Sequence, residues 1–131
     1  MNEDKLEIAD GPDLPPLWQA FGAYLREDGH WGMPELTVEL ASPDAALHIG
    51  PQHVLLETAA TSYAANLAGT GRLQIRSWHV MFLARAKAGP FRVDGEAIRG
   101  AGATVAARVT LRDEGNGNRM VTSASAVFEL S

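Results

Sequence analysis

The second half of this chain carries four strand-like segments in a row, separated only by short links, and this pattern constrains the fold more than any other feature. The segment from 104 to 112 alternates most regularly. Its apolar side carries Val105, Ala107, Val109 and Leu111, and its other side is largely polar, with Thr104, Arg108, Thr110 and Arg112. A turn cluster, Asp-Glu-Gly-Asn-Gly-Asn, follows it at 113–118. The four expected strands span 72–84, 90–98, 104–112 and 119–130. Consecutive strands with tight links predict an antiparallel sheet.

The first half of the chain supplies the helical part of the fold. The alanine-rich segment 51–68 is expected to form one long helix that ends at Gly69. The residues Leu36, Val38 and Leu40 alternate with polar neighbours, which indicates a further strand. Upstream we expect a loose lead-in over 1–15 and a helix from Pro16 to Gly29. A turn is expected at 31–34. The predicted class is α+β, with a five-stranded antiparallel sheet, a long central helix and an extra N-terminal helix.

Length and composition limit what the protein can do. The chain has 131 residues, 46% of them hydrophobic, so residues 16–131 are expected to form a single domain with its own core. Its formal net charge of −5 without a basic cluster argues against nucleic acid or an anionic membrane as a partner. No apolar run reaches the roughly 20 residues of a membrane span, and Met1–Asp10 lacks an apolar signal core. We therefore expect a soluble, cytoplasmic protein; the absence of cysteine excludes thiol chemistry.

The segment His48–Glu57 carries the chemistry. It begins at the expected start of the long helix, where backbone amides without helical acceptors form a ready oxyanion site. Nine positions after His48, the lone carboxylate of Glu57 sits among apolar neighbours, which is costly unless the carboxylate is paired or used. An oxyanion site and a carboxylate on one helix point to carbonyl chemistry.

Several motifs at fixed spacing resemble the PaaI-like acyl-CoA thioesterases of the hotdog fold. Members of that family carry His-Gly-Gly at the helix start and an Asp or Glu nine positions after the histidine, as His48 and Glu57 stand here, followed by Thr58-Ala59. The family's aromatic-Leu-Arg-Pro-Ala-x-x-Gly segment is similar to Phe82–Gly89, and its last strand to Ala124–Phe128. The resemblance covers roughly 36–130. This chain departs from the pattern at the first glycine (Ile49), at the upstream Asn or Gln (Ser42), and in a hairpin that keeps only Arg99 of two basic residues.

The resemblance implies a role for each of these residues. Glu57 would be the nucleophile or general base, Ile49 with Gly50 the oxyanion donor, His48 a group that orients the loop or contacts the thioester, and Thr61 a group that places water. Ser77 is a second candidate for placing the water. Ser42 would contact the substrate, and Trp78 and Phe82 would line an acyl pocket. Arg85, Lys87 and Arg99 would contact coenzyme A phosphates. The substrate would be a small or medium acyl or aroyl coenzyme A thioester, and no further cofactor is implied.

Helix geometry adds a constraint on this site. The helix separates Pro51 from Glu57 by six residues, roughly 9 Å along the axis, so one carbonyl would not easily meet both groups of one chain. The resemblance implies that they come from two subunits of a homodimer, which would also form within a homotetramer.

Other interpretations stay open at this stage. A hotdog protein that binds an acyl thioester or another apolar ligand without hydrolysing it is the main alternative, and a hotdog dehydratase is a third. Glu57 and His48 would then be ordinary helix and loop residues, and Trp78 and Phe82 core residues. His48, His53 and Glu57 would form a metal site only with a further ligand that the sequence does not show.

Overall fold

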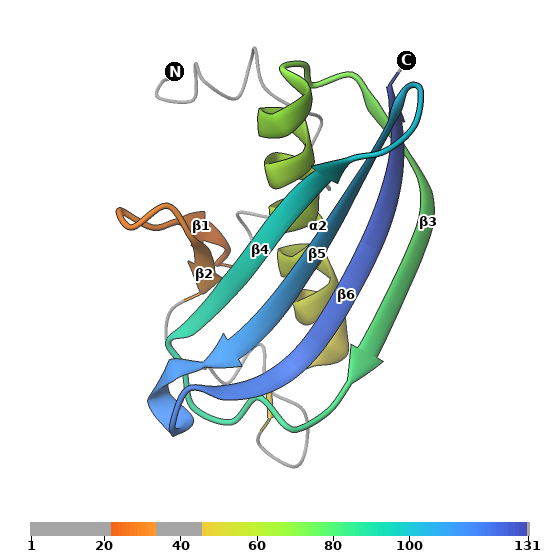
Figure 1. Cartoon of the computed structure of the whole chain (residues 1–131). Helices are drawn as coiled ribbons and strands as arrows, with labels where there is room; N and C mark the ends of the chain where they lie inside the picture. The colour runs from red at the N-terminus through yellow and green to blue at the C-terminus, as the bar shows by residue number, and fades with distance from the viewer. Residues whose placement is uncertain (1–21, 34–45, 131) are drawn as a thin grey trace.

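One long helix packs against a six-stranded antiparallel sheet in the part of the chain that the computed structural model describes, residues 22–33 and 46–130 (Figure 1). The order of strands in the sheet is β1-β2-β4-β5-β6-β3, so the edge strands are β1 and β3. The elements are β1 (Tyr24–Leu25), β2 (Trp31–Met33), α2 (Ile49–Ala68), β3 (Leu73–Phe82), β4 (Phe91–Arg99), β5 (Thr104–Asp113), the short 3-10 helix η3 (Glu114–Asn116) and β6 (Arg119–Leu130).

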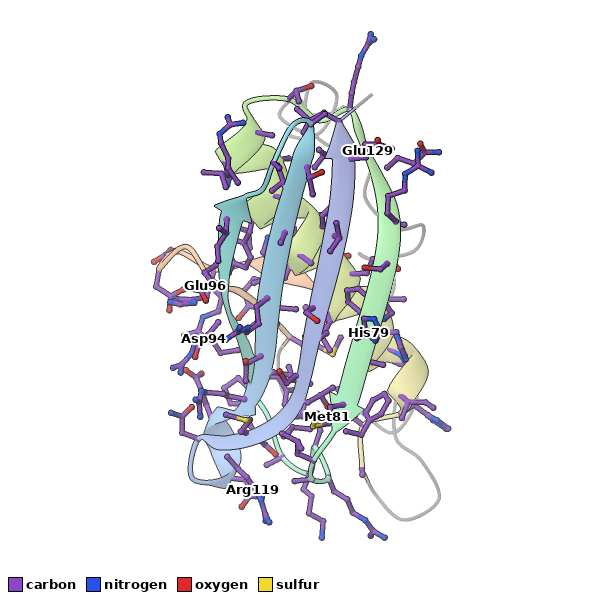
Figure 2. The ribbon with its side chains drawn as sticks, turned by 45° about the vertical axis from the view of Figure 1, so that its right-hand side comes forward. His79, Met81, Asp94, Glu96, Arg119 and Glu129 are labelled. Atoms are coloured by element: carbon purple, nitrogen blue, oxygen red, sulfur yellow. The ribbon has the colours of Figure 1, made fainter. Side chains whose placement is uncertain are left out.

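The core lies between α2 and the concave face of the curved sheet (Figure 1). The alternation predicted for the third strand segment is confirmed, because Val105, Val109 and Leu111 of β5 are fully buried against the helix layer. From the helix side, Leu55 and Leu56 are fully buried, each worth about 1.5–3 kcal/mol of stability. Polar and charged side chains occupy the opposite face and the margins of the sheet, His79 and Glu96 among them (Figure 2).

The central helix has the predicted end and an earlier start. Gly69 takes the left-handed conformation, with φ 74°, and its N–H donates to the Ala65 carbonyl at 2.9 Å. Glycine adopts this conformation without the steric cost that a Cβ would bring. The helix begins at Ile49 rather than at Pro51, because proline is tolerated in the first turn, where its missing N–H has no acceptor to lose.

Three predictions for the N-terminal part were wrong. Tyr24 and Leu25 are not in a helix; they form β1, and both are largely exposed. The segment expected to turn at 31–34 contains β2, with Trp31 and Met33 buried in the core. Gly29, at φ 87°, reverses the chain between the two strands. Among the described residues the sheet therefore has six strands, where five were expected for the whole chain. The lead-in at 1–15, the start of the expected helix at 16–21 and the strand expected at 36–40 lie outside the described residues.

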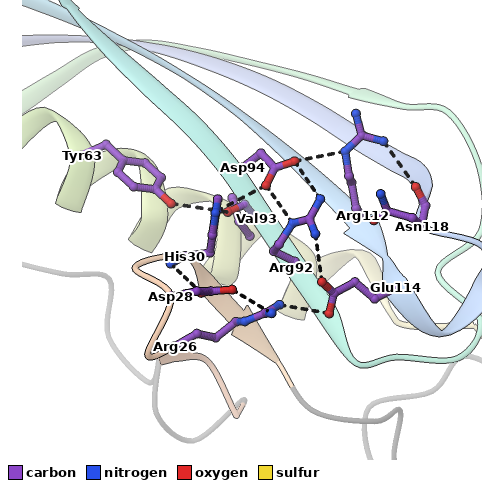
Figure 3. A network of polar contacts seen from close by, with 10 residues as sticks. All are labelled: Arg26, Asp28, His30, Tyr63, Arg92, Val93, Asp94, Arg112, Glu114 and Asn118. Carbon is purple, nitrogen blue, oxygen red and sulfur yellow. Dashed lines mark hydrogen bonds and ion pairs between the residues drawn. The ribbon is translucent and has the colours of Figure 1, made fainter.

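A polar network fastens the β1–β2 hairpin to the sheet (Figure 3). Asp94 of β4 accepts hydrogen bonds from Arg92 Nε at 2.8 Å and Arg112 Nε at 3.1 Å, and His30 Nδ1 lies 3.3 Å from its Oδ1. Glu114 accepts from Arg92 at 2.9 Å and from Arg26 at 3.0 Å, so the hairpin is bound to both β4 and η3. The network joins the β1–β2 hairpin, β4 and η3 at one margin of the sheet, and its role is structural.

Replacing Asp94 should change how stability depends on pH. Burial raises the pKa of the Asp94 carboxyl, but hydrogen bonds from Arg92 and Arg112 and nearby positive charge outweigh it, and the pKa lies below its ordinary value of 3.8. A lowered pKa stabilises the folded state fully above the ordinary value, and that stabilisation is lost as pH falls through the folded-state pKa. We expect Asp94→Asn to lower the free energy of unfolding at neutral pH and to flatten its decline below about pH 4. Denaturant unfolding at a series of pH values measures this; an unchanged decline would contradict it.

Gly95 of β4 lies so close to Tyr63 of the helix that a larger side chain does not fit there. A methyl group at this position would lie 2.5 Å from Cε2 of Tyr63, whose hydroxyl donates to the Val93 carbonyl at 3.3 Å. We expect Gly95→Ala to reduce the free energy of unfolding by about 1–3 kcal/mol, since the Tyr63 ring must shift. Thermal or denaturant unfolding checks this. The variant Gly50→Ala serves as a control, because the added methyl group meets no neighbouring atom within 4 Å and alanine adopts the helical backbone of this position without strain. Equal losses in both variants would show that packing against Tyr63 is not the cause.

Candidate active site

The start of α2 is exposed, as an oxyanion site requires. The side chain of Ile49 is 57% exposed, and His48 and Gly50 are exposed beside it. The first backbone bond of the helix runs from the Gln52 N–H to the His48 carbonyl at 3.3 Å, and within the described residues the Ile49 and Gly50 amides have no acceptor. The helix dipole adds positive potential at this end. These amides are therefore available to an anionic ligand atom.

Gln52 holds this helix start in place. Its side chain is only 3% exposed, its Nε2 donates to the Leu47 carbonyl at 3.0 Å, and its Oε1 accepts from the Thr122 hydroxyl at 2.6 Å. Sequence reasoning missed this pair, since Thr122 lies on β6, seventy positions further along the chain. The signal was a glutamine on the same helix face as the apolar Leu55, Leu56 and Ala59, because an amide buried among them needs partners.

The β3–β4 connection brings two predicted basic residues to the same place. The Leu47 N–H donates to the Ala86 carbonyl at 2.7 Å, so the loop containing Arg85 and Lys87 pairs directly with the residue before His48. Both side chains are exposed. Asp113 holds this loop in place. Its fully buried carboxylate accepts hydrogen bonds from the backbone N–H groups of Lys87, Ala88 and Gly89 at 2.8–3.0 Å.

Glu57 projects from α2 two turns further along. It is half-buried, its neighbours Leu56, Thr58 and Ala60 are fully buried, and no described residue gives it a hydrogen bond or an ion pair. Thr61, one turn later, is 7% exposed. A half-buried carboxylate without a partner is available to act on a ligand or on water.

An aromatic cluster lies beside the first half of the helix. Trp78 Nε1 donates to His53 Nδ1 at 3.3 Å, and the ring centroids of His53 and Phe82 are 5.6 Å apart in an edge-on arrangement. Trp78 and Phe82 were predicted as pocket residues, whereas the part played by His53 in uniting them was missed. Ser77, half-buried, stands directly before Trp78 on β3, after an irregularity in the strand pairing.

Two predicted residues do not join this group within one chain. Arg99 donates from Nη2 to the Leu67 carbonyl at 3.1 Å, at the opposite end of a helix of 20 residues, about 30 Å long. Ser42 lies outside the described residues. The roles of Arg99 at the coenzyme A phosphates and of Ser42 in binding the substrate stay predictions.

The described residues contain no group of three His, Cys, Asp or Glu side chains placed to hold a metal ion.

A hollow of about 290 Å³ opens elsewhere, over β3, β5 and β6, and is lined by residues such as His79, Arg108 and Ser125 rather than by the helix. Because no residue of α2 lines this hollow, we place the candidate site at the helix start instead. Within the described part, no helix combines the length and apolarity needed to cross a membrane.

Comparison with known proteins supports the fold. No family model and no curated protein matches the sequence. Solved structures do match. A protein from the thioesterase superfamily has a TM-score of 0.75 and 22% identity, covering 89% of this chain and 90% of that one.

Two further structures agree with this result. A thioesterase enzyme of Staphylococcus aureus subsp. aureus Mu50, solved as a Gln-to-Ala mutant, has a TM-score of 0.73 and 22% identity, covering 89% of this chain and 99% of that one. The PaaI protein from the phenylacetic acid degradation operon of E. coli has a TM-score of 0.70 and 16% identity, covering 85% of each chain. The long helix packed on an antiparallel sheet, shared with these proteins, shows that this chain has the hotdog fold.

Proposed function

We propose that this protein is an acyl-CoA thioesterase that hydrolyses a small or medium acyl or aroyl thioester. The observation that carries the proposal is one helix that offers both a half-buried Glu57 and an exposed start with the Ile49 and Gly50 amides, all without a partner among the described residues. The names of the structural neighbours support the same chemistry.

In the proposed reaction, Glu57 acts on the thioester carbonyl carbon, either directly as nucleophile or by taking a proton from an attacking water. The charge that forms on the carbonyl oxygen is stabilised by the Ile49 amide, with Gly50 beside it. The C–S bond then breaks, so that thioester and water yield a carboxylic acid and free coenzyme A. Thr61 would place the water, and His48 would orient the loop. Arg85 and Lys87 would bind the phosphates of coenzyme A as charge-assisted contacts.

The two parts of this machinery are too far apart to act within one chain. Ile49 and Glu57 are eight residues apart on α2, which corresponds to about 12 Å of helix. A thioester carbonyl needs both within a few ångströms. We therefore infer that Glu57 acts with the Ile49 amide of a second copy of the chain.

The edge strand β3 is the surface on which we place that second copy. It is ten residues long, and within residues 22–33 and 46–130 it pairs with β6 alone. A long edge strand that exposes apolar residues is a ready site for pairing with another strand, and Ile75, Met81 and Phe82 are between 39% and 61% exposed. Antiparallel pairing of two β3 strands would give a symmetric homodimer, which can assemble further into a homotetramer.

Purified protein incubated with a panel of acyl-CoA thioesters of differing chain length, with free thiol release as the measurement, tests the proposal. We expect release with at least one small or medium acyl or aroyl substrate. The alternative function, ligand binding without turnover, is favoured by the branched side chain of Ile49, which stands exposed at the helix start. Absence of thiol release together with an acyl thioester retained in native mass spectra would support that alternative and contradict hydrolysis.

A further inference from the structure

His53 is the one titratable side chain of the aromatic cluster, and the proposed reaction does not yet use it. It lies four residues before Glu57 on α2, so both side chains project from the same face of the helix. Its ring is half-buried, with Trp78 hydrogen-bonded to it and Phe82 edge-on to it. These two contacts restrict the orientation of His53, which stands one helical turn before a carboxylate that no described residue pairs.

The contact with Trp78 also fixes which nitrogen of His53 carries the hydrogen. An indole N–H only donates, so Nδ1, at 3.3 Å from Trp78 Nε1, must be the acceptor. A neutral imidazole with an unprotonated Nδ1 carries its hydrogen on Nε2. Within the described residues, no group accepts a hydrogen bond from Nε2. The structure therefore presents His53 as an oriented donor without an acceptor of its own.

Resting on the proposed function, we propose that His53 donates this Nε2–H to the sulfur of the thioester as the C–S bond breaks. Of the reacting atoms, the carbonyl oxygen is assigned to the Ile49 amide and the nucleophile to Glu57, which leaves the sulfur without a donor. The bond from carbonyl carbon to oxygen forms and the C–S bond breaks. His53 keeps its proton throughout. Glu57 receives a proton from the water and passes that proton to the departing thiolate.

The aromatic side chains around His53 should strengthen its hydrogen bond to the sulfur. Trp78 and Phe82 cover two sides of the His53 ring, and a hydrogen bond to developing charge is stronger where fewer waters compete for it. The bond is needed most as negative charge grows on the sulfur, so its loss should lower kcat more than it raises KM.

Steady-state kinetics of three variants tests this role. We expect His53→Phe, which keeps a ring but has no donor, to lower kcat about 10- to 100-fold with KM within about twofold. His53→Gln keeps an N–H donor and should recover most of the lost kcat. His30→Phe, the same change at a half-buried histidine of the β1–β2 hairpin, is the matched control and should leave kcat unchanged. A His53→Phe variant with wild-type kcat, or a His53→Gln variant no better than it, would overturn the proposal.

A second readout does not depend on activity. Nitrogen-resolved NMR of the histidine rings reports which ring nitrogen carries the hydrogen. We expect the Nε2–H form for His53 in the wild type and a mixture of both forms in Trp78→Phe, with a parallel loss of kcat. A wild-type ring protonated on Nδ1 would refute the inference. Wild-type protein that hydrolyses no thioester would instead contradict the proposed function, and with it this role.

Discussion

Replacing Glu57 by Gln is expected to lower kcat for acyl-CoA hydrolysis by about 10²- to 10⁴-fold, the range lost when a positioned general base is removed. The glutamine side chain has the same shape, and no described residue depends on the carboxylate for a hydrogen bond or ion pair. Folding should therefore be unaffected, and KM should change little. Thiol release at saturating substrate measures kcat, and a thermal unfolding curve shows that the fold is intact.

The matched control for this variant is Glu96→Gln. Glu96 is exposed on β4 and also has no partner within the described residues, but it lies far from the helix start. The control should keep wild-type kcat. If Glu57→Gln were as active as Glu96→Gln, Glu57 would have no part in the chemistry, and its place in an apolar wall would need another explanation.

Replacing Asp113 by Ala is expected to cost more stability than any other single change considered for this chain. The carboxylate is fully buried and accepts three backbone N–H groups of the β3–β4 loop. Removing it leaves three donors without a partner, at about 1–3 kcal/mol for each that stays buried, so a total loss of about 3 kcal/mol or more is expected. Denaturant unfolding measures the free energy directly.

This variant should also raise KM for the coenzyme A thioester, because the loop that it loosens carries Arg85 and Lys87 beside the helix start. Arg119→Ala, an exposed residue paired with Asp113 in the strand register, provides the control and should change neither quantity. A stable Asp113→Ala variant with ordinary unfolding would show that the loop is held by other contacts.

Local patterns in the sequence were sufficient to predict the strands and the helix of the second half. The alternation of Val105, Val109 and Leu111 follows from the pleat of a strand with one buried face, and Gly69 ends the helix because of its own conformational freedom. Both are properties of a few neighbouring residues, and for this reason they can be seen in one sequence.

Contacts between distant segments could not be predicted in the same way. Trp31–Met33 forms a strand because β4 supplies its hydrogen-bonding partner, and nothing next to it in sequence shows this. The Gln52–Thr122 bond and the three amides on Asp113 also join residues that are far apart in sequence. Spacing predicted Glu57 and the helix start as parts of one site. It could not reveal that His53, Trp78 and Phe82 form a cluster, since that depends on where β3 packs.

The most direct test of the shared active site is complementation between two inactive variants. Glu57→Ala removes the carboxylate, and Ile49→Pro removes the amide at a position where proline fits, since His48 has the extended backbone, φ −59° and ψ 150°, that a residue before proline prefers. Each variant alone should be inactive. In a mixed dimer, one site would combine the intact Glu57 of one copy with the intact Ile49 amide of the other.

After unfolding and refolding together in equal amounts, half of the dimers are mixed and each carries one intact site, so about a quarter of wild-type activity should return. The measurement is thiol release by the co-refolded mixture, compared with each variant refolded alone. Recovery near that level is the result that we predict. A mixture as inactive as its two components would contradict an active site built from two copies of this chain.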